Sequence, residues 1–188
     1  MRLPSWWRVA ASAAVFNVVW TASVWLAGRE QWALGAVIAG VGGAIHVGIG
    51  RPSAKLLATM LVVGVVGLAV DLALIEAGVL GFATAGPGIG AVVWVVGLWA
   101  DFAPGVPVML GWLRSRLWLS VPLGIVGGPA AYWIASKLGA VSLMRDWSLF
   151  AIAVQWAVLF PLSAWALTRP RGVFLRRAGA GAASGATP

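Results

Sequence analysis

Four polar residues interrupt the long apolar stretches of this chain: Asn17, His46, Asp71 and Asp101. Such side chains are costly in hydrocarbon, at about 2.5–3.5 kcal/mol for an aspartate at the centre of a membrane span. Residues kept at that cost bind ions, pass protons or bond to a neighbouring helix. We therefore treat these four residues as one candidate polar cluster inside a membrane.

Asp101 has the most unusual surroundings, because Pro104 and Pro107 follow it closely. A proline lacks an N–H and clashes with the preceding turn, so the carbonyls of Ala100 and Ala103 should lose their usual partners. A carboxylate beside freed carbonyls in a broken helix is typical of cation sites in transporters. The alternative is a protonated aspartic acid that bonds to a neighbouring helix.

Asp71 and another acidic residue, Glu76, lie in the outer half of the third apolar stretch. Five positions place them about 140° apart around a helix, so they do not share a face. We expect Glu76 to reach the outer headgroups. An acid–base pair would instead join Asp71 with Asp101 across two helices.

His46 is the only histidine, and the chain has no cysteine. It could relay a proton or bind a metal, but a zinc site would need carboxylates to complete it, so we expect no metal and no cofactor. Asn17 and Gln155 are expected to bond between helices. No serine stands in a recognisable catalytic pattern with the histidine, so an enzyme is the less favoured reading.

The composition places these residues in a membrane protein. The chain of 188 residues is 61% hydrophobic and 10% charged, with a mean hydropathy of +0.95. Soluble domains carry about 25% charged residues, so a soluble enzyme is excluded. The net charge is +8, but the basic residues stand between apolar runs and in the C-terminal tail. That placement is typical of a topology signal and argues against nucleic-acid binding.

Six stretches are long enough to cross a hydrocarbon layer of about 30 Å as helices. They are Val9–Ala27, Trp32–Gly50, Ala54–Leu80, Ala91–Leu113, Leu117–Gly139 and Trp147–Thr168. The sequence thus predicts an all-α fold, a compact bundle of six transmembrane helices forming a single domain over residues 1–168. Residues 169–188 form a basic and then Gly/Ala-rich tail that we expect to be disordered. Gly86–Gly90 is expected to be a turn.

The positions of lysine and arginine predict the orientation. One side collects ten of them: Arg2, Arg8, Arg51, Lys55, Arg114, Arg116, Arg169, Arg171, Arg176 and Arg177. The other side collects only Arg29, Lys137 and Arg145. Both termini and the tail should therefore be cytoplasmic.

Small residues predict where helices approach each other closely. In the second stretch they recur at every fourth position, at Ala36, Gly40, Ala44 and Gly48, and the fifth stretch has Gly124 and Gly128. Small side chains let helix backbones come together in lipid, where no hydrophobic force drives them. Both sets are predicted to be packing seams.

Several short motifs resemble a bacterial membrane-protein family known as domain of unknown function 2878. They are Phe16-Asn17 with Trp20, His46, Gly67-Leu68 with Asp71 and Leu74, Trp112-Leu113-Arg114, Gly127-Gly128-Pro129 with Tyr132, and Leu138-Gly139-Ala140. The resemblance covers roughly residues 10–168 and implies a multi-pass protein of the bacterial inner membrane. Its members often lie near genes for enzymes that resemble cyclopropane-fatty-acid synthases. The segment Ala103–Pro107 departs from the family's pattern.

Three functional hypotheses follow. The leading one, implied by the resemblance, is an accessory factor in membrane-lipid (fatty-acid) metabolism; its partners would be membrane lipids or a lipid-modifying enzyme. The alternative is a small proton- or cation-coupled transporter that uses Asp101 and Asp71. A weaker alternative is an intramembrane lipid-modifying enzyme with these two carboxylates as acid and base.

Overall fold

Six long helices make up most of the computed structural model, which describes residues 6–82 and 88–168. The helices are α1 (Trp6–Ala27), α2 (Trp32–Gly50), α3 (Ala54–Glu76), α4 (Ile89–Met109), α5 (Ser120–Lys137) and α6 (Ser148–Thr168). All six spans, with α5 extended by the short turn before it, are long and apolar enough to cross a membrane. The predicted fold class is therefore confirmed. The predicted disordered tail and the first two residues of the predicted Gly86–Gly90 turn lie outside the described residues. Gly88 precedes α4, which begins at Ile89, so the end of the predicted turn is helical.

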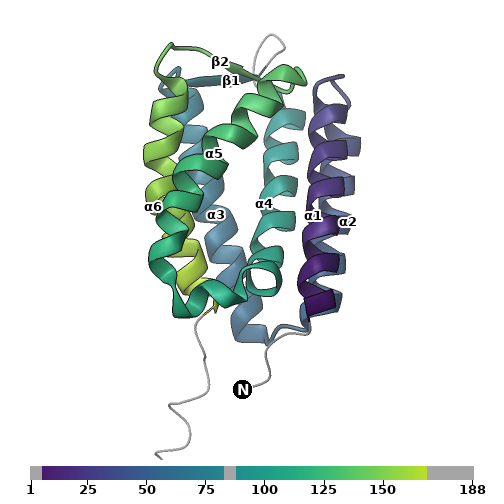
Figure 1. Ribbon diagram of the computed structural model, residues 1–188. Helices are drawn as coiled ribbons and strands as arrows, with labels where there is room; N and C mark the ends of the chain where they lie inside the picture. Colours follow the sequence, from purple (N-terminus) through teal and green to yellow (C-terminus); the bar gives the residue numbers. More distant parts are fainter. Residues whose placement is uncertain (1–5, 83–87, 169–188) are drawn as a thin grey trace, which may run out of the picture.

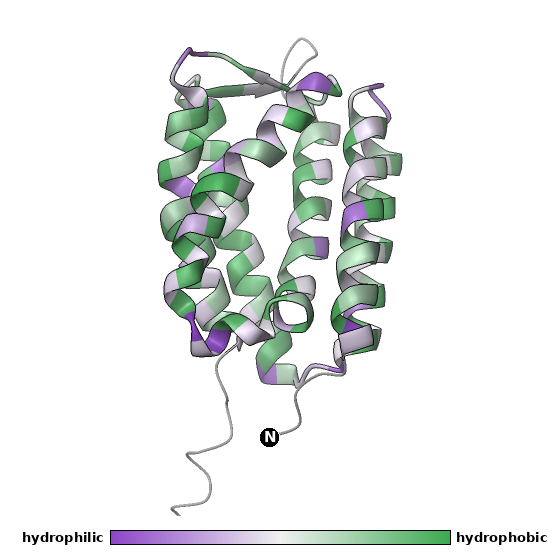
Figure 2. Cartoon of the chain, viewed as in Figure 1, coloured by the Kyte–Doolittle hydropathy of each residue, from purple (hydrophilic) through white to green (hydrophobic). Residues whose placement is uncertain are grey.

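The helices run alternately up and down, so α1 begins and α6 ends at the same end of the bundle (Figure 1). We call this the terminal end, and the opposite end the strand end. Hydrophilic residues gather mainly near the two ends, while the lengths of the helices are largely apolar (Figure 2). This distribution matches a bilayer with polar layers on both sides. That the terminal end faces the cytoplasm stays a prediction from the arginine and lysine positions.

A small sheet closes the strand end and was not expected from the sequence. Strand β1 (Leu80–Phe82) pairs antiparallel with β2 (Val141–Leu143), and Gly81 lies opposite Ser142 (Figure 1). The third apolar stretch was predicted to continue to Leu80, but α3 ends at Glu76, because Gly78 takes a left-handed conformation with φ of +65°. The chain then turns and runs across the bundle.

The fourth span differs from its prediction at both ends. Helix α4 ends at Met109 rather than Leu113, and two short 3-10 helices, η1 (Gly111–Ser115) and η2 (Leu117–Leu119), lead into α5.

Helix α4 continues through Pro104 and Pro107, so the expectation of a broken helix is wrong. The carbonyl of Ala100, which Pro104 leaves without its helical donor, lies against the backbone of Gly43 in α2. A Cα–H···O contact of this kind compensates in part for the lost bond.

The close approach of α2 and α4 uses mainly a different row of small residues from the one predicted. The buried residues of α2 are Gly35, Ala39, Gly42, Gly43 and His46. Of the predicted stripe, Ala36 packs against Gly97 of α4, but Gly40, Ala44 and Gly48 are exposed, so the prediction is wrong at these three positions. The two rows are adjacent on the helix, and spacing alone could not distinguish them. The seam predicted at Gly124 and Gly128 is confirmed, because both pack on Trp156 of α6.

Substitution of Gly43 by alanine tests this seam. A Cβ at Gly43 would lie 2.2 Å from the Ala100 carbonyl oxygen, whereas a Cβ at Gly40 would meet nothing within 4 Å. We expect Gly43→Ala to lower the free energy of unfolding by about 1–3 kcal/mol through overpacking, and Gly40→Ala to leave it unchanged. Denaturation by sodium dodecyl sulfate in bicelles measures both variants. Equal stabilities of the two variants would contradict the seam.

Candidate functional site

A buried polar group joins α1, α2 and α4. His46 lies between Ser12 and Asp101: its Nδ1 is 2.7 Å from the Ser12 hydroxyl oxygen, and its Nε2 is 3.3 Å from Asp101 Oδ1. All three side chains are at most 1% exposed. If the Ser12 hydroxyl donates to Nδ1, the proton of a neutral imidazole resides on Nε2 and faces the carboxylate. We call these three residues the His46 site.

Asp101 is poorly satisfied in this site. The contact with His46 has the distance of an ion pair but not the alignment of a hydrogen bond, and Oδ2 has no donor among the described residues. Oδ1 lies against Gly42, where an added Cβ would come within 2.5 Å. A buried oxygen without a donor calls for a proton, a water molecule or an ion as its partner. The site is therefore suited to proton exchange.

A small pocket reaches the site from the terminal end. It is lined by His46, Gly50, Pro52, Leu56, Met60, Pro104, Pro107 and Val108. Its cavity volume is about 70 Å³, which at about 30 Å³ per water molecule holds about two waters. Both prolines that follow Asp101 form part of its wall. This pocket therefore lies between His46 and the end of the bundle where α2 ends and α3 begins.

The second polar group surrounds Asp71 of α3. Tyr132 of α5 donates its hydroxyl to Oδ1 at 2.6 Å, Gln155 of α6 donates to the same oxygen at 3.0 Å, and Trp99 of α4 donates its indole N–H to Oδ2 at 2.8 Å. Three donors from three helices suit an ionised carboxylate. The interhelical role expected of Gln155 is confirmed. We call these four residues the Asp71 knot.

Two glycines support the Trp99 ring of this knot and the Trp156 ring that stacks on it. Trp99 and Trp156 are stacked, with ring centroids 5.9 Å apart and an interplanar angle of 7°. Gly67 of α3 supports one ring and Gly128 of α5 the other, and a Cβ at either glycine would come within 2.3 Å of an indole. This packing fills the space around Asp71 with rings.

The two groups lie on different sides of α4. Trp99 contacts Asp71 and Asp101 contacts His46, and two positions correspond to about 200° around a helix. The structure therefore does not bring Asp71 and Asp101 together as an acid–base pair. Of the four residues that were expected to form one cluster, only His46 and Asp101 are in contact.

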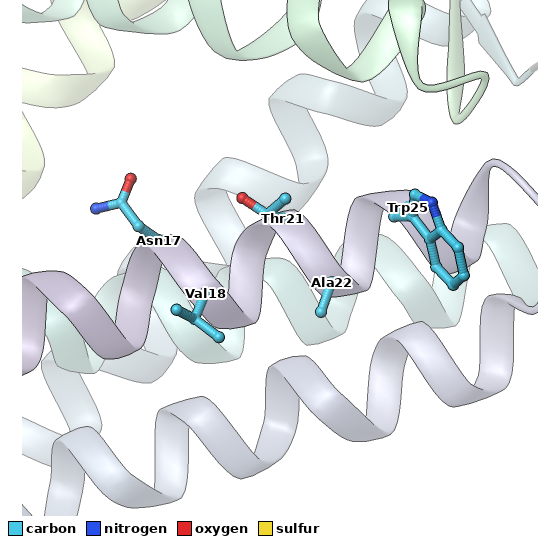
Figure 3. A pocket seen from close by; sticks show the side chains of 5 residues that line it. All are labelled: Asn17, Val18, Thr21, Ala22 and Trp25. Carbon is cyan, nitrogen blue, oxygen red and sulfur yellow. The ribbon is translucent and has the colours of Figure 1, made fainter.

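Asn17 stands apart from both groups. Its side chain is exposed and donates to the carbonyl of Ala13 in its own helix, at 2.8 Å. With Val18, Thr21, Ala22 and Trp25 it lines a shallow, open hollow on the outer side of α1 (Figure 3). The expected interhelical bond from Asn17 is not made within the described part of the chain.

Sequence reasoning missed three residues of these groups. Ser12 gave no signal, because serine is common in membrane helices and its partner is 34 positions away. Trp99 was one of many tryptophans. Tyr132 is the only tyrosine and lies in a motif that carries the family resemblance, so it offered the best clue.

Among the described residues, no group of three or more His, Cys, Asp or Glu side chains gathers as a metal site would require.

The fold and these two buried polar groups define the class: a polytopic α-helical membrane protein with six spans and titratable groups inside its bundle. A comparison with protein families gives the particular family. The family model described as Protein of unknown function (DUF2878) matches residues 9–162, more than half of the chain, and the chain belongs to this family. The resemblance noted from the motifs is thus confirmed.

No curated protein and no solved structure matches the chain.

Proposed function

We propose that this protein is a small proton-coupled membrane transporter in which the His46 site binds and releases the proton. The single observation that carries the proposal is Asp101 Oδ2, a fully buried carboxylate oxygen without a donor among the described residues. A purely structural aspartate would use both oxygens, as Asp71 does. In Asp101 neither oxygen accepts an aligned hydrogen bond from a described residue, which is costly and is typical of a group that exchanges a proton.

The position of His46 supports this role. Its Nε2 faces Asp101, and the residue also lines the terminal-end pocket, so the imidazole can exchange a proton with the carboxylate at the edge of a space that holds water. Imidazole suits this step because its nitrogens can both bind and release a proton. Ser12 fixes the ring by its contact with Nδ1. The pocket has room for water but not for a larger solute in this conformation.

A role in membrane-lipid metabolism is the second candidate. It is implied by the gene neighbourhood expected of the family, and the open hollow on α1 is the feature that favours it (Figure 3). The hollow is shallow and lies on the surface of one helix, which suits loose contact with an acyl chain. The acid–base enzyme with Asp71 and Asp101 is not proposed further, because these two residues bind different partners.

Proton flux into proteoliposomes tests the proposal. Vesicles that hold the protein and a trapped pH dye are given an outside acid pulse, first without solute and then with pools of ions, amino acids, sugars and drugs. We expect at least one pool to produce a flux that empty vesicles lack and that His46→Gln abolishes. Equal fluxes for wild type, His46→Gln and empty vesicles with every pool would overturn the proposal. A changed lipid composition on gene deletion would then favour the second candidate.

A further inference from the structure

We propose that the outer face of α1 is a dimer interface with a second copy of this chain, centred on Asn17. This inference is independent of the proposed function. It starts from Asn17, which lies near the middle of α1 and has an exposed side chain that points away from α2 (Figure 3). At that depth the surroundings are lipid, which offers neither donor nor acceptor.

The carboxamide of Asn17 is only partly satisfied within one copy. One N–H bonds to the carbonyl of Ala13. This is the one hydrogen bond of the Asn17 side chain among the described residues, and it leaves the side-chain oxygen and the second N–H available. Interhelical bonds of asparagine are a known means of association in membranes, and an acyl chain cannot replace them.

The residues around Asn17 leave room for a second helix. The exposed positions of α1 on this side are Ala10, Ala14, Asn17, Val18, Thr21 and Trp25. Ala10 and Ala14 are small residues four positions apart, a spacing that permits close approach of two backbones. The hollow on α1 extends this exposed face towards the strand end. It is lined by Val18, Thr21 and Trp25.

The occupant that fits best is a second copy. An amide carries a donor and an acceptor, so two Asn17 side chains related by a two-fold axis satisfy each other reciprocally. A two-fold interface must be self-complementary in this way. A polar asparagine in an otherwise apolar helix seam also fixes register and oligomeric state in coiled coils.

Disulfide crosslinking in membranes tests the interface, and the natural chain is free of cysteine. We expect Ala14→Cys to give a crosslinked dimer under mild oxidation. The control is Leu61→Cys, on the outward side of α3 and 69% exposed, which should crosslink several-fold less. Adding Asn17→Leu to Ala14→Cys should lower the dimer yield several-fold without loss of thermal stability, because Asn17 makes no contact within the core.

Three outcomes would overturn the inference. One is equal crosslinking at Ala14→Cys and Leu61→Cys. Another is a monomer mass for the wild-type protein in nanodiscs by mass photometry. The third is an Ala14→Cys adduct with a different protein in place of the dimer. Asn17→Leu should keep the proton flux of the wild type, because a monomer with an intact His46 site should still bind protons. Failure of the dimer can therefore be distinguished from failure of the proposed function.

Discussion

Replacement of Asp101 by asparagine is expected to abolish the proton-linked flux while leaving the protein folded. Asparagine has nearly the same shape but cannot take up and release a proton. Its effect on stability should be small, within about 1 kcal/mol, because Asp101 forms no aligned hydrogen bond that the substitution would break. We expect the flux of Asp101→Asn to fall to the level of empty vesicles.

The matched control for this variant is Glu76→Gln. It removes the same charge from an exposed carboxylate at the end of α3, away from the His46 site. Flux through Glu76→Gln should equal that of the wild type. If Asp101→Asn keeps full flux, or if both variants lose it equally, the carboxylate of Asp101 is not the proton carrier.

Replacement of Asp71 by alanine is expected to have the largest effect on stability. The alanine leaves three buried donors, on Trp99, Tyr132 and Gln155, without their acceptor and opens a void beneath the stacked indoles. Interhelical hydrogen bonds in membranes contribute about 0.6–2 kcal/mol each. We therefore expect a loss of about 2–5 kcal/mol in the free energy of unfolding, measured by steric trapping or detergent denaturation in bicelles.

Two milder variants of the same knot make the prediction specific. Asp71→Asn keeps one carbonyl acceptor and should lose less stability than Asp71→Ala. Tyr132→Phe removes one donor and should cost about 1 kcal/mol. If all three variants have the same free energy of unfolding as the wild type, the Asp71 knot does not hold α3 to the other helices.

The contrast between the two aspartates could not be predicted from the sequence. Both lie in apolar stretches at similar cost, and sequence reasoning paired them with each other. What separates them is the local packing. Trp99 turns toward α3 and fills one side of α4, whereas Asp101, two positions later, turns toward α2.

The spans themselves were predictable, because bilayer thickness sets helix length and apolar composition marks each crossing. The ends of the spans were less predictable. The chain leaves α3 at Gly78 to form β1, and strand pairing between residues 59 to 63 positions apart gives no local signal. The continuity of α4 through Pro104 also depended on a neighbour. Gly43 of α2 supplies the surface against which the freed carbonyl of Ala100 packs.

Nuclear magnetic resonance of His46 tests the central claim most directly. The chain has a single histidine, so ¹⁵N-histidine labelling yields one imidazole, whose tautomer and charge can be followed in lipid bilayers from pH 5 to pH 9. The account predicts that the tautomer or charge of this imidazole differs between wild type and Asp101→Asn, because Nε2 faces the carboxylate of Asp101. Identical imidazole spectra of the two proteins at every pH would contradict it.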